Sequence, residues 1–363
     1  MKKKISLIIP SLRGGGSERV TLNIVRKLSR KKFDIQLIIL HNTGPLADQL
    51  PNDIHVVDLK TSRVRYSIFK LIKELNKFQP DVIFSTLGHL NLMLLGIKKR
   101  LKSKPIIIVR QNNVPSKSIN KNRIIFYFLY KLLYPKSDLV ISQCNEMKED
   151  MIKSFGLKEE KIKVIYNPLD VSLIKSKMLE GNPYDHNLIN IVVAGRLTYQ
   201  KGFDIIIKEF YQISKNIQNV HLTILGEGEL YSELSKLVEY FNLRDKVDFV
   251  GFQANPYPYY YNAYCYILSS RWEGFPNTLL EALACETMVI SSNCKTGPKE
   301  ILEDGYYGYL VDVNTKGNIK EAFIDSLGVK VDFKKNREKD FDIKKIIKEY
   351  EDIFNSSREE LSK

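Results

Sequence analysis

The feature that most limits the fold of this chain is a regular alternation between short apolar runs and longer amphipathic stretches. The short runs are rich in β-branched residues, which is typical of buried strands, and the intervening stretches are long enough for helices. In the first half the runs lie at 5–9, 35–40, 82–85, 106–109 and 139–142. In the second half they lie at 189–193, 221–225, 247–250, 265–268 and 288–291. This order predicts parallel sheets joined by crossover helices.

The two series of strands indicate two domains. A chain of 363 residues is long enough for two, since a domain averages roughly 150 residues. Between the series, residues 166–188 are polar and contain proline and glycine, which is typical of a linker. We therefore predict an α/β protein with two tandem Rossmann-like, doubly wound domains, at 1–168 and 169–342, that face a cleft. Ligands of such sheets bind at the carboxyl ends of the strands.

Positive charge is concentrated in the first half of the chain. The net charge is +14, and residues 1–170 hold 32 Lys and Arg against 14 Asp and Glu. A basic domain indicates a polyanionic partner, which could be nucleic acid, anionic lipid or a phosphorylated substrate. The sequence contains no recognisable nucleic-acid reader module, so nucleic acid is not the predicted partner. A basic nucleic-acid-binding protein stays an alternative.

The sequence predicts neither export nor a membrane span. The first apolar run ends at Pro10, which makes it too short for the core of a signal peptide. No run approaches the roughly 18 apolar residues that a membrane span needs. Cys144, Cys265, Cys285 and Cys294 form no CxxC pair, so we expect reduced thiols in a cytoplasmic protein.

A glycine-rich loop follows the first predicted strand. In SLRGGGSERV, Gly14, Gly15 and Gly16 precede a predicted helix that Ser17 could cap. Glycines at this place let backbone N–H groups approach an anion at the start of the helix. The loop is neither a Walker motif nor a GxGxxG fingerprint, so a plain tight turn is an equally good interpretation.

The corresponding loop of the second half is more specific. GRLTYQKGFD, at 195–204, follows a predicted strand and precedes a predicted helix. Arg196 and Lys201 both lie in this loop, where their charged groups can converge on one polyanion. A planar guanidinium fork and a compact ammonium together suit a diphosphate. A solvated surface pair is the alternative interpretation.

A second loop of this half carries two carboxylates. SSRWEGFPNTLLEA places Glu273 in a loop and Glu281 eight residues later, in a helix predicted to begin near Asn277. The first-turn N–H groups of that helix could bind an anion, and Gly274 permits close backbone approach. Two carboxylates beside a helix N-terminus suit a ligand with sugar hydroxyls and a diphosphate. An ordinary surface acid is the alternative for Glu281.

Several motifs occur in a fixed order and together resemble a known family. They are GRL…KG, ILGEGEL, FVGFQANPY, the Glu-x7-Glu element of Glu273 and Glu281, CKTGPKEIL and DGYYGYLV. The set resembles the retaining glycosyltransferases of family 4, which have the GT-B fold. The resemblance is strong over 189–311 and weak over the first half. It is closest to bacterial enzymes that extend surface glycans or lipid-linked oligosaccharides, including N-acetylgalactosamine transferases.

The resemblance implies roles for individual residues. Arg196 and Lys201 would bind the donor diphosphate, Glu281 the ribose hydroxyls, and Glu273 the transferred sugar. The base would lie near Gly226, Gly251 and Phe252, and Gly15 and Gly16 would reach the diphosphate from the first domain. The remaining pocket would be formed by backbone groups of Gly274, Phe275, Pro276, Asn277 and Thr278.

The chain departs from the family pattern at two places. ACETMVI replaces the frequent ACGTPVI, so Glu286 and Met288 stand where relatives have Gly and Pro. We expect this change to alter the end of the preceding helix more than the chemistry. Many relatives also carry a His where this chain reads RQNN, at 110–113. His89, in the loop after 82–85, and Asn112 and Asn113 are therefore the acceptor-side candidates.

The predicted function is retaining, metal-independent hexosyl transfer with no cofactor. The donor is expected to be a UDP-sugar, and the sugar a hexose or an N-acetylhexosamine. The acceptor would be a glycan on polyprenyl diphosphate, used for lipopolysaccharide, capsule or oligosaccharide synthesis. A DxD triplet at 340–342 is interpreted as the start of a helix, 343–354, which the family packs back onto the first domain. A sugar-nucleotide epimerase of the same architecture is the alternative enzyme.

One segment of the basic half suggests membrane contact. In KNRIIFYFLYKLLYPK, at 121–136, helical spacing places Tyr127, Tyr130 and Tyr134 on one face together with basic residues. Isoleucine, leucine and phenylalanine populate the other side. Tyrosines beside cations favour a membrane–water interface, although a helix that covers the domain core would show the same pattern. With basic clusters at 26–32 and 98–104, the segment predicts peripheral binding to an anionic bilayer at the inner face of the cytoplasmic membrane.

Overall fold

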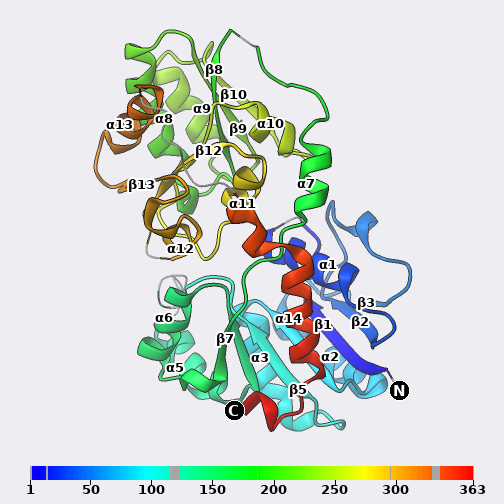
Figure 1. Ribbon diagram of the computed structural model, residues 1–363. Helices are drawn as coiled ribbons and strands as arrows, with labels where there is room; N and C mark the ends of the chain where they lie inside the picture. The colour runs from blue at the N-terminus through cyan, green and yellow to red at the C-terminus, as the bar shows by residue number, and fades with distance from the viewer. Residues whose placement is uncertain are drawn as a thin grey trace. The chain divides into compact units, whose positions relative to one another are not determined.

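The computed structural model describes residues 2–13, 15–114, 116, 123–185, 187–294, 296–328 and 336–362. Gly14, residues 121–122 and Lys295 of the motifs above lie outside this part. The chain divides into two compact units, Met1–Pro168 with Ile343–Lys363 and Leu169–Asp342 (Figure 1). Each unit is a parallel sheet flanked by helices, so the predicted α/β class with two Rossmann-like sheets is confirmed.

The first unit contains a seven-stranded sheet in the order β3-β2-β1-β4-β5-β6-β7. Its strands are β1 (Lys3–Ile9), β2 (Phe33–Ile39), β3 (His55–Asp58), β4 (Val82–Thr86), β5 (Ile106–Arg110), β6 (Leu139–Ser142) and β7 (Ile162–Val164). The five long apolar runs form the inner strands, as predicted. The edge strands β3 and β7 were not predicted, because both are short and partly exposed.

Helices cover both faces of this sheet. They are α1 (Gly16–Lys27), α2 (Val64–Phe78), α3 (Gly88–Ile97), α5 (Arg123–Leu133), α6 (Asn145–Phe155) and α14 (Ile343–Asn355). α1 and α14 share one core with the sheet, whereas α2, α3, α5 and α6 share the other. α14 is held by aromatic packing, since the rings of Tyr350 and Phe354 lie 5.6 and 5.7 Å from that of Phe84.

The orientation of α5 differs from the sequence prediction. Its tyrosine face is the buried one: Tyr134 is fully buried and Tyr130 is 4% exposed. The Tyr134 hydroxyl donates to Gln111 Oε1 at 2.6 Å and accepts from Asn91 Nδ2 at 3.1 Å. Because neighbouring side chains satisfy their polar groups, the tyrosines pack inward and cannot form the expected membrane interface.

The second unit contains a six-stranded sheet in the order β10-β9-β8-β11-β12-β13. Its strands are β8 (Ile189–Ala194), β9 (Val220–Leu225), β10 (Val247–Gly251), β11 (Cys265–Leu268), β12 (Met288–Ser292) and β13 (Tyr309–Val311). Its helices are α7 (Val171–Lys177), α8 (Phe203–Asn216), α9 (Tyr231–Tyr240), α10 (Tyr257–Asn262), α11 (Asn277–Ala284), α12 (Pro298–Ile301) and α13 (Asn318–Gly328). The five predicted runs match β8 to β12, and only the three-residue edge strand β13 was missed.

The predicted linker at 166–188 is only partly a connector. Residues 171–177 of it form α7, which Asp170 caps by accepting a hydrogen bond from the N–H of Leu173 at 3.1 Å. The N–H of Leu169 donates to the carbonyl of Phe341 at 2.8 Å, so this stretch belongs to the second unit. Within the described residues, every helix is too short or too polar to cross a membrane.

Candidate active site

Close backbone packing shapes the carboxyl edge of the second sheet. A Cβ atom on Gly226 would lie 2.0 Å from the carbonyl oxygen of Gly195, and one on Gly228 would lie 2.4 Å from that of Leu197. Gly226 also has a φ of +127°, a conformation that disfavours residues with a side chain. The loops after β8 and β9 therefore touch through their backbones, and only glycine fits at these two positions.

Lys201 and Glu273 form the central contact at this edge. Lys201 ends the short helix η5 (Tyr199–Lys201), and its aliphatic stem lies on Gly195, where a Cβ would be 3.4 Å away. Its ammonium lies 2.6 Å from Glu273 Oε1. The exposed fractions of the two side chains are 20% and 6%. The pair is thus shielded from most solvent, which strengthens its electrostatic interaction.

Three further groups hold the loop of Glu273. The hydroxyl of Ser270 donates to Glu273 Oε1 at 2.6 Å, and the hydroxyl of Thr296 donates to the backbone carbonyl of the same residue. A Cβ on Gly297 would lie 2.4 Å from the carbonyl oxygen of Gly274, so these two backbones are also in contact. The CKTGPKEIL motif therefore fixes the position of Glu273, a role that the sequence analysis did not assign.

Glu281 lies near the same buried phenol as Glu273. The hydroxyl of Tyr266, from β11, donates to the hydroxyl of Thr278 at 2.7 Å. Burial raises the pKa of Tyr266, and the negative charges of Glu273 and Glu281 raise it further. The charges of both carboxylates therefore influence the Tyr266 hydroxyl. Tyr266 itself has no recognisable signal in the sequence, because it stands in an ordinary apolar strand.

Arg196 lies at the same edge with its side chain exposed. It directly follows Gly195, on which the stem of Lys201 rests, and its carbonyl accepts a hydrogen bond from the N–H of Thr198 at 2.7 Å. Arg196 and Lys201 thus lie in the loop after β8 and Glu273 in the loop after β11, at one edge of the sheet, and Glu281 lies in α11, the helix that follows Glu273. If these residues had lain on different surfaces of the unit, they could not bind one common ligand.

A second set of contacts joins the two loops behind the Lys201–Glu273 pair. The guanidinium of Arg271 donates to both carboxylate oxygens of Asp204, at 2.8 and 2.7 Å, and lies 3.9 Å from the ring centroid of Tyr199. The side chain of Gln200 donates to the carbonyl of Trp272 at 2.9 Å. Arg271 and Asp204 stand inside the quoted motifs SRWEG and KGFD, but their pairing requires the fold.

Of the other residues predicted to bind the nucleotide-sugar donor, some are buried in the unit and others are partly or largely exposed. Phe275 is 5% exposed and its ring packs against Phe341, with centroids 5.6 Å apart, so its side chain serves the unit's own packing. Of Phe275, only the backbone remains available to line the predicted donor pocket. Gly274 and Pro276 are buried, whereas Asn277 and Thr278 open α11 and are half-buried. Phe252, after β10, is 41% exposed.

The glycine loop of the first unit differs from its prediction. Ser17 lies inside α1, and Gly15 is the residue that precedes the helix. The carboxylate of Glu18 accepts a hydrogen bond from the N–H of Gly15 at 2.8 Å. Ser17 instead accepts from Asn112 Nδ2 at 2.7 Å. One of the N–H groups expected to face an anion is therefore occupied by the protein's own acid, while Gly16 begins the helix.

Asn112 organises the carboxyl edge of the first sheet. Its amide nitrogen donates to Ser17 and to the carbonyl of Thr86, at 2.7 and 3.2 Å. Its oxygen accepts from Arg110 Nη1 and Gln143 Nε2, at 2.6 and 2.8 Å. Because these four bonds use the whole hydrogen-bonding capacity of an amide, Asn112 holds the loop rather than offering a free group to an acceptor.

Arg110, the first residue of RQNN, is fully buried at the end of β5. It donates to Asn112 and to the side chain of Asn167, and no carboxylate of a described residue pairs with it. Burial lowers its pKa. The nearby hydroxyl of Tyr350, on α14, acts in the opposite direction and offsets part of this shift.

His89 and Asn113 are the other acceptor-side candidates. His89 lies in the first turn of α3 and not in a loop as predicted. The residue is exposed, and desolvation by the protein atoms around its imidazole lowers its pKa. Asn113 is half-buried, and its carbonyl accepts from Gln111 Nε2 at 2.9 Å.

The DxD triplet and the ACETMVI segment have structural explanations. Asp340 accepts from Arg337 Nη1 at 2.6 Å, and Phe341 is fully buried, in the short helix η7 (Arg337–Phe341) that precedes α14. Glu286 has a φ of +60° just after α11. This is the left-handed position at which many helices end in glycine, so the substitution indeed falls on helix termination.

Comparison with known proteins identifies the family. The model for glycosyl transferases group 1 matches residues 174–340, and that for Glycosyltransferase Family 4 matches residues 14–173. A glycosyltransferase of Methanocaldococcus jannaschii is 32% identical over 78% of this chain and 81% of its own. The chain belongs to the family 4 glycosyltransferases.

Other relatives of this glycosyltransferase include enzymes with named substrates. One, of Campylobacter jejuni, is named N-acetylgalactosamine-N,N'-diacetylbacillosaminyl-diphospho-undecaprenol 4-alpha-N-acetylgalactosaminyltransferase. It is 29% identical over 87% of this chain and 88% of its own. The crystal structure of Anabaena HepE with UDP and glucose matches with a TM-score of 0.82 and 18% identity, over 98% and 100% of the two chains. This likeness confirms the GT-B fold.

Proposed function

We propose that this glycosyltransferase moves a hexose or N-acetylhexosamine from a UDP-sugar to a glycan on polyprenyl diphosphate, in bacterial surface polysaccharide or oligosaccharide synthesis. The observation that carries the proposal is the Lys201–Glu273 pair, with Arg196 in the loop of Lys201 and Glu281 in the helix that follows Glu273. UDP and glucose in the Anabaena structure support the donor. The undecaprenol diphosphate in the name of the Campylobacter relative supports the acceptor.

The cations would act on the leaving group. Negative charge develops on the diphosphate as its bond to the anomeric carbon breaks, and fixed positive charges at that place lower the barrier. An ammonium has three donors, of which Lys201 gives one to Glu273, so two remain for phosphate oxygens. The fork of Arg196 would bind the same group. Glu273 would accept a hydroxyl of the sugar, and Glu281 the ribose hydroxyls.

The transfer would retain the configuration of the donor. The acceptor hydroxyl attacks the anomeric carbon from the face that the diphosphate leaves, and its proton passes to the departing phosphate oxygen. Lys201 and Arg196 supply the positive charge that a metal ion provides in other phosphate-transfer sites. We therefore propose that the enzyme works without a metal.

One reaction tests both of these features. We expect unchanged turnover in excess EDTA, because Lys201 and Arg196 carry the charge that stabilises the leaving group. In the same reaction, NMR of the anomeric proton should show a product with the donor's configuration. Loss of turnover that Mg²⁺ or Mn²⁺ restores would contradict metal independence, and an inverted product would contradict the front-face mechanism.

The donor can be identified by thermal stabilisation. A ligand present at about 100 times its dissociation constant adds roughly 2.7 kcal/mol to the free energy of unfolding. We expect UDP-sugars to raise Tm, and GDP- and ADP-sugars to leave it near that of the free protein. Binding of the donor found in this way can be confirmed by a change in the fluorescence of Trp272. This is the single tryptophan of the chain, and it directly precedes Glu273.

Product analysis distinguishes transfer from epimerisation. A sugar-nucleotide epimerase would convert the stabilising donor when no acceptor is present, whereas the proposed transferase leaves the intact donor unchanged until a lipid-linked glycan is added. Conversion of the donor in the absence of acceptor would show that the enzyme is an epimerase and not a transferase. The assignment of the donor-binding site would remain valid.

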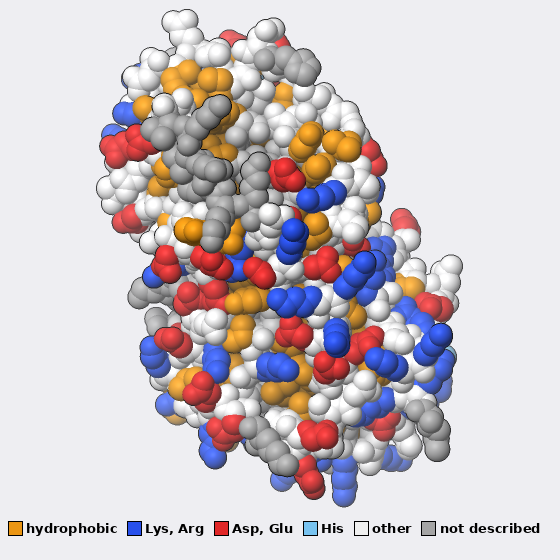
Figure 2. All heavy atoms as spheres, viewed as in Figure 1, with side chains coloured by type: hydrophobic (Ala, Val, Ile, Leu, Met, Phe, Trp, Pro, Cys, Tyr) orange, Lys and Arg blue, Asp and Glu red, His pale blue; other side chains and the backbone are white. Residues whose placement is uncertain are grey.

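We also propose that the protein works at the inner face of the cytoplasmic membrane. Its acceptor would be anchored there, and residues 1–170 carry the excess of Lys and Arg. On the face shown in Figure 2, the basic side chains of the first unit are interspersed with acidic ones. On this face the charges are mixed, so it offers no continuous basic surface to a membrane.

A further inference from the structure

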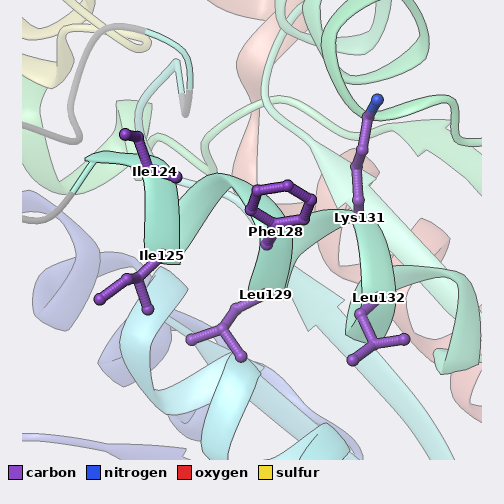
Figure 3. A pocket seen from close by; sticks show the side chains of 6 residues that line it. All are labelled: Ile124, Ile125, Phe128, Leu129, Lys131 and Leu132. Carbon is purple, nitrogen blue, oxygen red and sulfur yellow. The ribbon is translucent and has the colours of Figure 1, made fainter.

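The outer face of α5 exposes large apolar side chains that no described residue covers. Ile124, Ile125, Phe128 and Leu132 are 74%, 59%, 66% and 63% exposed. They surround a shallow groove that Leu129 and Lys131 complete, as Figure 3 shows. A single exposed apolar residue is ordinary, but a contiguous set on one helix marks an interaction surface.

The inner face of α5 explains why this surface is free. Tyr130 and Tyr134 fill the core against α3, and their rings stack with centroids 4.5 Å apart. The hydroxyl of Tyr127 donates to the carbonyl of Ser154 on α6 at 2.6 Å. The tyrosines anchor the helix to the unit, so the opposite aliphatic face points away from it.

Cations gather at the C-terminal end of α5. The turn η3 (Tyr134–Lys136) continues this helix, and Lys98 Nζ donates to the carbonyl of Lys136 at 2.8 Å. The short helix η2 (Lys98–Arg100) therefore lies beside that end. Lys99, Arg100 and Lys136 are exposed, and none forms an ion pair with a described residue. Anionic headgroups would complement them.

Nearby acids do not cancel this charge. On α6, Glu149 pairs with Lys153 at 2.8 Å, and Asp150 accepts from the hydroxyls of Ser116 and Ser154, at 2.7 and 3.1 Å. Asp138 is shared between Lys98 and Arg358. The acids around the apolar face therefore already have partners within the first unit.

We propose that the aliphatic face of α5 inserts into an anionic bilayer, with Lys99, Arg100 and Lys136 against its headgroups. The inference rests on the proposed membrane-bound acceptor and names the surface that reaches it. Apolar side chains flanked by basic ones are the pattern of helices that lie in the interface plane. The hydroxyl of Tyr130 in α5 lies against Gly88, which follows the carboxyl end of β4, so α5 packs beside the carboxyl edge of the first sheet.

Vesicle flotation of paired variants tests the surface. Phe128→Glu with Leu132→Glu places two charges on the proposed face. The matched control, Tyr240→Glu with Leu179→Glu, changes residues of the second unit that are 78% and 63% exposed. With vesicles of phosphatidylethanolamine and phosphatidylglycerol, we expect the α5 variant to partition about tenfold more weakly than the native protein, and the control within twofold of it. Equal Tm values for the three proteins would exclude unfolding.

The outcomes separate the surface from the reaction. Sugar transfer to an acceptor in detergent micelles should be equal in all three proteins, because neither pair touches the donor site. Flotation of the α5 variant at the native level would overturn the inference and leave the transferase intact. If light scattering shows a native dimer that the α5 variant splits, with vesicle binding unchanged, the face instead binds a second copy. Vesicle binding without sugar transfer would leave this surface standing and remove the proposed function.

Discussion

Replacing Lys201 by Met is expected to lower kcat/KM about a hundredfold while the protein stays folded. Met keeps an apolar stem to lie on Gly195 but removes the ammonium from the leaving group. A fixed charge or donor at such a place contributes about 3 kcal/mol to the stabilisation of the transition state. We expect Arg196→Ala to cost a similar amount, since its guanidinium would bind the same diphosphate. Initial rates with donor and acceptor at several concentrations give the measurement.

Controls must separate catalysis from stability, because Lys201→Met leaves the carboxylate of Glu273 without its ion-pair partner. Lys201→Met combined with Glu273→Gln removes both charges, so we expect Tm to recover towards the native value while turnover stays low. Lys208→Ala, on the exposed surface of α8, should have a kcat/KM within twofold of that of the native enzyme. Turnover near the native level in both Lys201→Met and Arg196→Ala would contradict the proposed site.

The fold was predictable where hydrophobic periodicity is strong. Each inner strand of both sheets coincides with an apolar run, because a strand buried on both faces needs continuous apolar sequence. The edge strands β3, β7 and β13 escape this rule, since they are three or four residues long and partly exposed. α7 was hidden for a related reason, as it is only seven residues long inside a polar stretch.

The candidate site was predictable only as far as its motifs reach. Arg196, Lys201, Glu273 and Glu281 stand in motifs whose spacing suggests a common ligand. The groups that hold these loops in place cannot be recognised from spacing. Thr296 bonds Glu273, 23 positions away, and Arg271 bonds Asp204, 67 positions away. Tyr266 lies within an ordinary apolar strand and gives no signal of its own. Such contacts are products of the fold, and no local pattern specifies them.

α5 shows the limit of periodicity most clearly. The sequence defines two faces of this helix but does not say which of them is buried. Tyrosine was placed outside because an aromatic ring with a polar tip suits a membrane interface. The structure places it inside, because Gln111 and Asn91 satisfy the hydroxyl of Tyr134 within the core. The partners that decide the orientation come from two other elements of the unit.

Gly202→Ala is expected to destabilise the protein and to abolish most activity, whereas Gly156→Ala should have a small effect. The two glycines have nearly the same backbone conformation, with φ values of +66° and +67°. An added Cβ meets nothing within 4 Å at Gly156, but at Gly202 it would lie 2.2 Å from the carbonyl oxygen of Ser269. The pair therefore separates the cost of the left-handed conformation from the cost of a backbone collision.

The expected sizes follow from these two terms. The conformation alone costs about 1–2 kcal/mol in either variant. Overpacking adds about 1–3 kcal/mol at Gly202, because a backbone carbonyl cannot rotate away as a side chain can. Denaturant unfolding of both variants measures this difference, and equal losses of stability would show that the contact with Ser269 is unimportant.

The effect on catalysis at Gly202 should exceed the effect on stability. Gly202 directly follows Lys201, and Ser269 precedes Ser270, which bonds Glu273. A collision between these backbones would move the loops of Lys201 and Glu273 apart, and their 2.6 Å contact would be lost. Since misplacement by about 1 Å can reduce rates roughly a hundredfold, the folded fraction of Gly202→Ala should bind UDP weakly and turn over slowly. Native turnover by that fraction would show that the spacing of the two loops does not govern the reaction.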